Sequence, residues 1–293
     1  SPRGGDLYSN LDVFLYDLVQ KRKLAVVPVA SSVDSELAEP SPLGDYLLIN
    51  FGHGGEGRQS GVEAYNPQNG AFVGKVATGH GHGSTALAPD GSQWYVWSTF
   101  DTEFGAGQGQ PRIVKARIPR GYDDWKAGDT SGQVALLELD WEANLHISCR
   151  SPSVEWCAVS TYGMTKTNVP YYHEIFRLSL NSTLQSSKVQ RLAHHYSDFD
   201  YVNNTVACSM SPYWAHPHAS TSPDGLKILF GSTWGQACRA EAYIIQLSGA
   251  APPPPPPDRI PPNVSITSPN SGQTASDTIT VTGQGQATVA PDV

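Results

Sequence analysis

Short strand-prone runs recur along the chain, and each follows a proline and a polar turn. Four stretches align on that proline: SPLGDYLLINFGH from Ser41, APDGSQWYVWSTF from Ala88, SPSVEWCAVSTYG from Ser151 and SPDGLKILFGSTW from Ser222. Runs rich in β-branched and aromatic residues that are bounded by Pro-Asp-Gly turns are typical of β-hairpins. The pattern therefore predicts four hairpins along the chain.

The segments between these stretches predict outer strands. GVEAYNPQNGAFVGKVATG reads as strand, turn and strand, while RIVKARI with VALLELDW and EIFRLSL with VQRLAHH repeat that plan at longer spacing. DVFLYDLVQKRKLAVVPV predicts an outer pair with no inner pair before it, and EAYIIQL predicts a third strand with no obvious fourth. Tandem hairpin units separated by ~40 residues or more indicate propeller blades. We expect an all-β fold, a β-propeller of at least four blades over residues 1–250, and the number of blades stays open.

The composition fits a folded domain without a nucleic-acid partner. The 293 residues are 39% hydrophobic and 16% charged, which is too apolar for a disordered chain. The formal net charge of −8 argues against binding nucleic acid, and it weighs against a polyanion unless a local basic pocket outweighs it. No apolar run approaches the ~20 residues of a membrane helix, so no membrane span is expected.

Cysteines and glycosylation sequons favour an oxidising compartment. The 4 cysteines form an even set with pairable spacing, and Asn-x-Ser/Thr sequons begin at Asn181, Asn203 and Asn263. We therefore expect an extracellular or cell-surface glycoprotein. Residues 1–5 do not have the pattern of a signal peptide, so the chain is expected either to begin after processing or to be a piece of something longer.

The four proline-headed stretches resemble the TolB-type SPDG propeller repeat of many secreted and periplasmic bacterial proteins. The resemblance covers roughly residues 10–247. It implies the propeller fold and says almost nothing about function, because one fold hosts many activities.

The direction of the innermost strand gathers the histidines on one face. In a four-stranded blade this strand runs from the top face to a bottom turn, here Pro-Asp-Gly, so the residues before it lie on top, near the central channel. Links between second and third strands, and the end of an outer strand that runs upward, lie on top as well. All 9 histidines occupy such positions: His53, His80, His82, His146, His173, His194, His195, His216 and His218. Propellers build binding sites on one face from such loops.

Two His-x-His pairs on this face suggest a metal site. Alternate residues of a strand share a side, so His80 with His82, and His216 with His218, each form a two-point clamp that a histidine from another blade would complete. Imidazole suits divalent zinc, copper, nickel, iron or manganese. The alternative is that these histidines are structural and bond the backbone of a neighbouring blade.

His-x-His immediately before a Pro-Asp-Gly hairpin is similar to the manganese site of the oligogalacturonate lyase propellers. The resemblance implies a metal held by His216, His218 and either His194 or His195. The family places an amide ligand a few residues earlier, and this chain departs from that pattern because it has Tyr213 there.

The same resemblance implies a reaction and its catalytic groups. In such lyases a base removes the proton alpha to the uronate carboxylate, which a metal or an arginine neutralises. Arg239 is the nearest obvious carboxylate partner, and His82 and His146 are the candidates for the base.

Aromatic residues share the links of the top face and suggest a platform on which a saccharide could stack. The alternative is that they fill the gaps between blades, where large aromatic side chains normally serve. The residues are Phe100, Tyr171, Tyr172, Tyr196, Tyr201, Tyr213, Trp214 and Trp234.

The predicted topology allows two disulfides. Cys208 and Cys238 both fall in top-face links, and Cys149 and Cys157 flank a bottom turn across a hairpin, where they could pair if they lie opposite each other. The alternative is four buried thiols.

A proline-rich stretch ends the propeller. Residues 251–262, APPPPPPDRIPP, predict a semi-rigid polyproline spacer. Residues 263–293 resemble the opening strands of bacterial Ig-like repeats, yet a sandwich takes ~100 residues. Either the full protein continues, or these strands pair with something else, including a second copy of the chain.

Three functions remain open at this stage. The first is a secreted or surface module that binds a saccharide or a metal on its histidine- and aromatic-rich face, with the tail as a tether or a link between subunits. The second is a propeller-type uronate lyase, which requires a basic, metal-loaded pocket. The third is a structural subunit of an extracellular filament, which requires tail strands ordered against another chain.

Overall fold

The computed structural model describes residues 12–30, 33, 35–51, 57–77, 79, 82–99, 111–118, 132–141, 143–150, 155–164, 167–197, 215–235, 239–247, 263–268 and 282–286. The chain divides into two compact units, residues 1–248 and 249–293. Throughout the described ranges the regular elements are β-strands, and those ranges contain no helix of the length and apolarity needed to cross a membrane.

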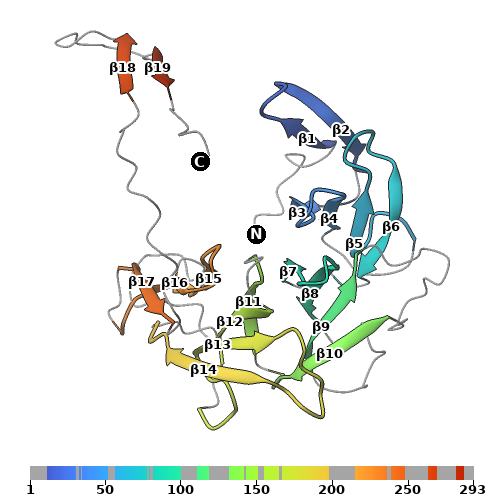
Figure 1. The fold of residues 1–293 in the computed structure, drawn as a ribbon. Coiled ribbons are helices and arrows are strands. Elements are labelled where there is room, and N and C mark those ends of the chain that lie inside the picture. The colour runs from blue at the N-terminus through green and yellow to red at the C-terminus, as the bar shows by residue number, and fades with distance from the viewer. Residues whose placement is uncertain are drawn as a thin grey trace. The chain divides into compact units, whose positions relative to one another are not determined.

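The described part of the first unit contains five antiparallel sheets, which follow one another in chain order (Figure 1). Sheet 1 pairs β1 (Asp12–Asp17) with β2 (Arg22–Pro28). Sheet 2 comprises β3 (Ser35–Pro40), β4 (Leu47–Phe51), β5 (Val62–Tyr65) and β6 (Phe72–Ala77). Sheet 3 comprises β7 (Gly83–Leu87), β8 (Gln93–Ser98), β9 (Arg112–Arg117) and β10 (Gln133–Glu138).

The remaining two sheets of this unit complete the series. Sheet 4 comprises β11 (Asn144–Ser148), β12 (Trp156–Tyr162), β13 (Glu174–Ser179) and β14 (Val189–His194). Sheet 5 comprises β15 (Ser220–Thr221), β16 (Lys227–Ser232) and β17 (Glu241–Gln246). Each four-stranded sheet is a meander in which every strand pairs with the next, which is the plan of a propeller blade. The predicted all-β propeller is confirmed, and the four proline-headed stretches each form a first hairpin.

Pro-Asp-Gly turns form two of those hairpins, the second and the fourth. In the second one, Gly91 N donates to Ala88 O at 2.9 Å, and Ser92 N donates to the carboxylate of Asp90 at 2.9 Å. Gly91 has a φ of 79°, a left-handed conformation that glycine adopts without strain. The turn at 222–226 repeats these contacts, so proline, aspartate and glycine each serve one position of the turn.

Alternation along the strands packs sheets 2, 3 and 4 each against two neighbours. On β4, Leu47, Ile49 and Phe51 pack with Val27 of sheet 1, whereas Leu48 packs with sheet 3. On β12, the odd-numbered positions face sheet 3 and the even-numbered ones face sheet 5. Because both faces of these strands are covered, they read as continuous apolar runs.

The first strands of sheets 2 to 5, which are β3, β7, β11 and β15, lie toward a common centre in Figure 1. They are called the inner strands below. The residues before β7 and β15 lie at one end of the inner strands, where His82 and His218 stack on His146 of β11, and the hairpin turns lie at the other end.

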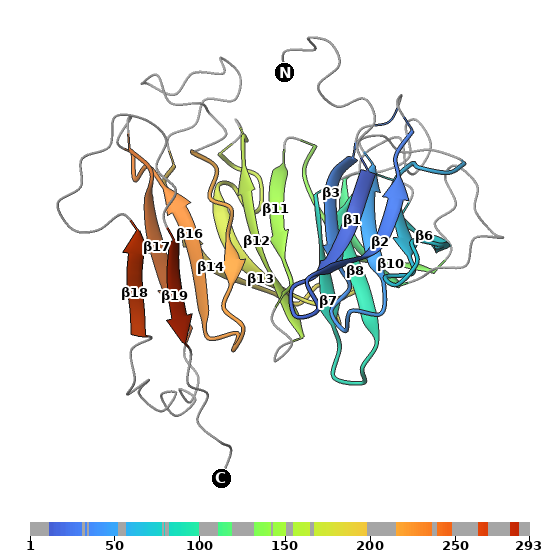
Figure 2. The same cartoon turned by 90° about the horizontal axis from the view of Figure 1, so that it is seen from above.

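The second unit has one described sheet, in which β18 (Asn263–Ser268) pairs with β19 (Thr282–Gln286). Figure 2 shows the two strands running antiparallel. The polyproline spacer lies outside the described residues, and the Ig-like character of the tail stays a prediction.

Candidate functional site

Three histidines, one on β11 and two in the segment before β15, bring ring nitrogens together near the start of the inner strands. His146 lies on β11, and His216 and His218 lie in the segment before β15. One nitrogen from each ring lies within 4.8 Å of the other two, and His146 Nε2 is 3.3 Å from His216 Nδ1. The ring of His146 also stacks on that of His218, with centroids 4.0 Å apart. These three residues are called the histidine cluster.

The separations in the cluster suit a shared metal ion. Zinc–nitrogen bonds of ~2.0–2.1 Å in a tetrahedral site place two nitrogens about 3.3 Å from each other. The distance from His146 to His216 already has this value. The nitrogen of His218 lies within 4.8 Å of the other two, so a change of its side-chain torsions would be needed to reach the same geometry.

Burial keeps two rings of the cluster, those of His146 and His216, uncharged. Loss of solvent, and then the neighbouring rings of His218, His82 and His216, lower the pKa of His146 to about 2. Burial, followed by His218 and His82, lowers the pKa of His216 to about 4. Neutral imidazole is the form that ligates a metal, so both rings are in the ligating form at neutral pH.

A turn, rather than a strand, presents the His-Pro-His segment. Strand alternation was expected to align His216 and His218, but β15 begins only at Ser220. His218 instead has a φ of 43°, a left-handed conformation that costs a residue with a side chain about 1 kcal/mol. Gly231 N of β16 donates to Pro217 O at 2.8 Å and holds the turn in place.

Two further rings flank the cluster. His82, expected as a ligand or a base, stacks on His146 with centroids 4.8 Å apart, and its Nδ1 lies 2.8 Å from Leu145 O. Tyr162, at the end of β12, stacks on His216 with centroids 3.9 Å apart. His82 therefore lies beside the histidine cluster and is not one of the three residues whose nitrogens converge.

His195 has a structural position. It is buried, its Nε2 donates to Thr161 O at 2.9 Å, and its Nδ1 accepts from Ser197 N at 3.1 Å. Burial lowers the pKa of His195 to about 4. Since both ring nitrogens are bonded to the backbone, this histidine has none left for a metal, contrary to the expectation from the lyase resemblance.

His194 and Arg239 also lie apart from the cluster. The His194 side chain is 48% exposed, and its Nε2 is 3.5 Å from Glu174. The Arg239 side chain is 82% exposed and pairs with Glu241 at 3.1 Å. The third ring of the cluster is His146, which the sequence suggested as a base rather than as a ligand.

The predicted aromatic residues divide between packing and a pocket. Tyr171 packs on Phe176, with centroids 4.7 Å apart, whereas Tyr172 and Trp234 line a pocket together with Tyr196. Asn181 is exposed in the turn after β13, and Asn263 begins β18. Other predicted positions lie outside the described residues: His53, His80, Phe100, Tyr201, Asn203, Cys208, Tyr213, Trp214 and Cys238.

The opposite end of the inner strands carries a disulfide. Cys149, just after β11, is bonded to Cys157 on β12, which is one of the two bridges expected from the hairpin topology. Both residues are buried between sheets 3 and 4. The bridge fixes the residue that follows it, Arg150, at the turn end of the inner hairpin.

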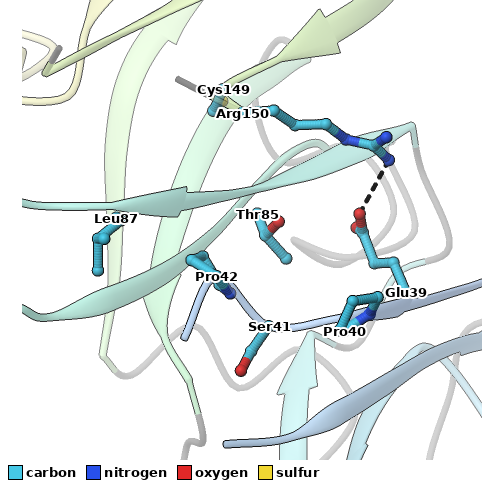
Figure 3. Close-up of a pocket in the computed structure, with 8 residues that line it drawn as sticks. All are labelled: Glu39, Pro40, Ser41, Pro42, Thr85, Leu87, Cys149 and Arg150. Carbon is cyan, nitrogen blue, oxygen red and sulfur yellow. Dashed lines mark hydrogen bonds and ion pairs between the residues drawn. The ribbon is translucent and has the colours of Figure 1, made fainter. Parts of the chain in front are cut away.

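Arg150 forms one side of a cavity of about 300 Å³, and Figure 3 shows it reaching toward Glu39 of β3. Arg150 donates to Glu39 Oε2 at 2.9 Å. Burial raises the pKa of Glu39, while the Arg150 charge and hydrogen bond oppose that rise. The sequence did not predict this pair, because a charged residue beside a hairpin turn is normally exposed to solvent. Glu39 and Arg150 come together only through the arrangement of the sheets.

No protein-family model and no curated protein matches this chain. Among solved structures, a protein assigned as TolB from Agrobacterium tumefaciens is similar over 83% of this chain and 67% of its own, with 17% identity and a TM-score of 0.48. An oligogalacturonate lyase in complex with manganese is similar over 80% of this chain and 53% of its own, with 16% identity and a TM-score of 0.47.

The oligogalacturonate lyase of Vibrio parahaemolyticus is similar over 69% of this chain and 46% of its own, with 18% identity and a TM-score of 0.41. This chain thus spans about half the length of the two lyases. Both families suggested by the sequence motifs are therefore represented among the similar solved structures.

Proposed function

We propose that this propeller is a ligand-binding module whose histidine cluster holds a divalent transition metal. The observation that carries the proposal is the convergence of three imidazoles, one on β11 and two in the segment before β15, with one nitrogen of each within 4.8 Å of the others. A histidine that serves blade packing bonds backbone groups, as His195 does. In the cluster His146 Nε2 is hydrogen-bonded to His216 Nδ1 at 3.3 Å, a separation that two nitrogen ligands of one zinc ion also have.

The donor set favours particular metals. A site of imidazole nitrogens alone suits zinc, copper or nickel, whereas manganese prefers sites with more oxygen ligands. Three protein ligands leave a fourth position open for water or for a ligand of the module. The expected occupant is therefore zinc or a similar ion that joins an incoming ligand to the propeller.

A uronate lyase is the second candidate function, and His82 favours it. This ring is exposed and stacks on His146, and its Nδ1 donates to Leu145 O, which leaves Nε2 as a proton acceptor beside the proposed metal. The residues that act electrostatically on the pKa of His146 are all histidines, and no arginine or lysine is among them. The metal would thus have to neutralise the uronate carboxylate, since Arg239 pairs elsewhere.

We also propose that the protein works outside the cytoplasm and that its tail tethers it or joins it to other subunits, including in a filament. The Cys149–Cys157 bridge supports an oxidising compartment. The β18–β19 sheet has two strands in its described part, and such a small sheet gains stability from a strand of another chain.

Metal analysis of the purified full chain tests the function. After removal of bound metal and reloading with zinc, we expect one equivalent in the native protein and none in His216→Ala/His218→Ala or in His146→Ala. His194→Ala, which alters an exposed histidine outside the cluster, should keep the metal. Native protein that binds no zinc, or equal retention in the cluster variants, would overturn the proposal. Release of unsaturated products from polygalacturonate separates the lyase from the binding module.

A further inference from the structure

A pocket of about 670 Å³ lies among the loops before β13, after β14 and after β16. Its volume falls within the ~300–1,000 Å³ of small-molecule sites. No member of the histidine cluster lines it, so it is separate from the proposed metal site. The lining residues used in the argument below are Tyr172, His173, His194, Tyr196, Ser197 and Trp234.

Two aromatic rings of this pocket are open to solvent. Tyr196 is 58% exposed and Trp234 is 50% exposed, and their centroids are 5.0 Å apart. Trp234 is backed by Tyr243 of β17, whose ring stacks on it at 5.1 Å. A supported indole with one accessible face can cover the apolar C–H face of a ring-shaped ligand.

The backbone holds these side chains in uncommon conformations. His173, Tyr196 and Trp234 have φ values of 47°, 52° and 49°, and left-handed backbone at residues with side chains concentrates at functional sites. Gly235 N donates to Tyr196 O at 2.7 Å and so ties the loops after β14 and β16 together. The pocket is therefore formed before a ligand arrives, which lowers the entropy cost of binding.

Two lining residues of the pocket each have a buried polar atom with no hydrogen-bond partner among the described residues: His173 Nε2 and Ser197 Oγ. The His173 ring bonds the backbone of Met164 through its other nitrogen, and burial lowers the pKa of His173. Its Nε2 is then an acceptor, while the Ser197 hydroxyl can donate or accept. Buried polar atoms are normally satisfied, so this pair points to a hydroxylated ligand.

The absence of acidic and basic side chains from the described lining favours an uncharged ligand. The described lining contains no aspartate, glutamate, lysine or arginine, so nothing there pairs with a uronate or another anion. We infer that the pocket binds a neutral saccharide, with a pyranose face on Trp234 and Tyr196 and hydroxyl groups on His173 and Ser197. This inference deepens the proposed ligand-binding function, and it does not depend on the metal.

Calorimetry of the full chain with a panel of tetrasaccharides tests the site. The neutral members are cellotetraose, maltotetraose, xylotetraose and mannotetraose, and tetragalacturonate is the acidic member. We expect a neutral tetrasaccharide to bind, Trp234→Ala to weaken that binding about 30-fold, and Ser197→Ala to weaken it about 10-fold. Tyr196→Ala, at a more exposed ring, gives the same test if Trp234→Ala does not fold.

Trp141→Ala is the matched control, because Trp141 is 48% exposed and lies outside the pocket lining; it should leave affinity unchanged. Binding should also persist in EDTA and in His216→Ala/His218→Ala, so that failure of the metal site and failure of this pocket give different results. No binding by any neutral member at millimolar concentration, a preference for tetragalacturonate, or an equal loss in Trp141→Ala would overturn the inference.

Discussion

The two ends of the inner strands differ in how their buried titratable groups are stabilised. At the histidine end, four imidazoles crowd together, and burial lowers the pKa of His146 and of His216 so that charge is avoided. At the turn end, Glu39 is buried beside Arg150, and the charge of Arg150 compensates that carboxylate. The first end thus gathers imidazoles of the kind that ligate an added cation, whereas the second already contains its cation.

The largest expected difference between the two ends is in their effect on metal affinity. Removing two ligands with His216→Ala/His218→Ala is expected to weaken zinc binding at least 1,000-fold, about 4 kcal/mol. Arg150→Gln at the other end should leave zinc binding unchanged, because that end lacks the converging nitrogens. Competition titration with a fluorescent zinc chelator measures both, and a loss of affinity in Arg150→Gln would contradict the separation of the two ends.

The disulfide should dominate stability at the turn end. It closes a loop with a sequence separation of 8, for which chain entropy predicts a contribution of about 2–3 kcal/mol. Cys149→Ala/Cys157→Ala is expected to lose at least this much in chemical denaturation. Reduction of the native protein, which keeps both side chains, should give a similar loss, and unchanged unfolding on reduction would count against the bridge.

Acid should destabilise the histidine end. The pKa of His195 is about 4 in the folded chain, against ~6.5 when unfolded. Between these values the unfolded state binds more protons, so stability falls as the pH is lowered from 6.5 to 4, by on the order of 2 kcal/mol for this residue. His195→Gln, whose amide can still donate to Thr161 O, should reduce the difference in unfolding free energy measured at pH 7 and pH 4.5. An unchanged difference would contradict the prediction.

The ion pair at the turn end should give the smallest effect. Arg150 is 62% exposed, so solvent screens the pair, and we expect a coupling of about 1 kcal/mol in a double-mutant cycle of Glu39→Gln and Arg150→Gln. The exposed pair of Arg112 and Glu138, at 3.3 Å, is the matched control and should show weaker coupling. Equal coupling in both cycles would mean that burial of Glu39 adds nothing.

The hairpins could be predicted from sequence because their chemistry is local. Proline, aspartate and glycine at 89–91 each serve one position of the turn, and strand alternation then sets which residues face each neighbour. The Cys149–Cys157 bridge followed from the same hairpin. The proximity of His82, His146, His216 and His218 could be predicted from the direction of the inner strands.

The composition of the site could not be predicted in the same way. Whether a histidine is a ligand depends on which ring nitrogens the backbone already uses, and for His195 those partners come from Thr161 and Ser197. The left-handed turn at His218 has no sequence signature, because glycine is absent there. Glu39 and Arg150 are 111 residues apart, and the sequence around either residue does not predict its contact with the other.

Each hydrophobic cluster in the described part of the propeller joins two successive sheets. The free energy of unfolding is then approximately a sum of contributions from each sheet and from each interface between neighbouring sheets. Sheets 2, 3 and 4 are held from both sides, while sheets 1 and 5 each pack on one described neighbour. Opening fluctuations should therefore begin at the two ends of the series, and amide protons of sheet 3 should exchange with solvent last. His146 lies on sheet 4, which is packed from both sides. Its partners His216 and His218 precede β15 of sheet 5, which is expected to open earlier.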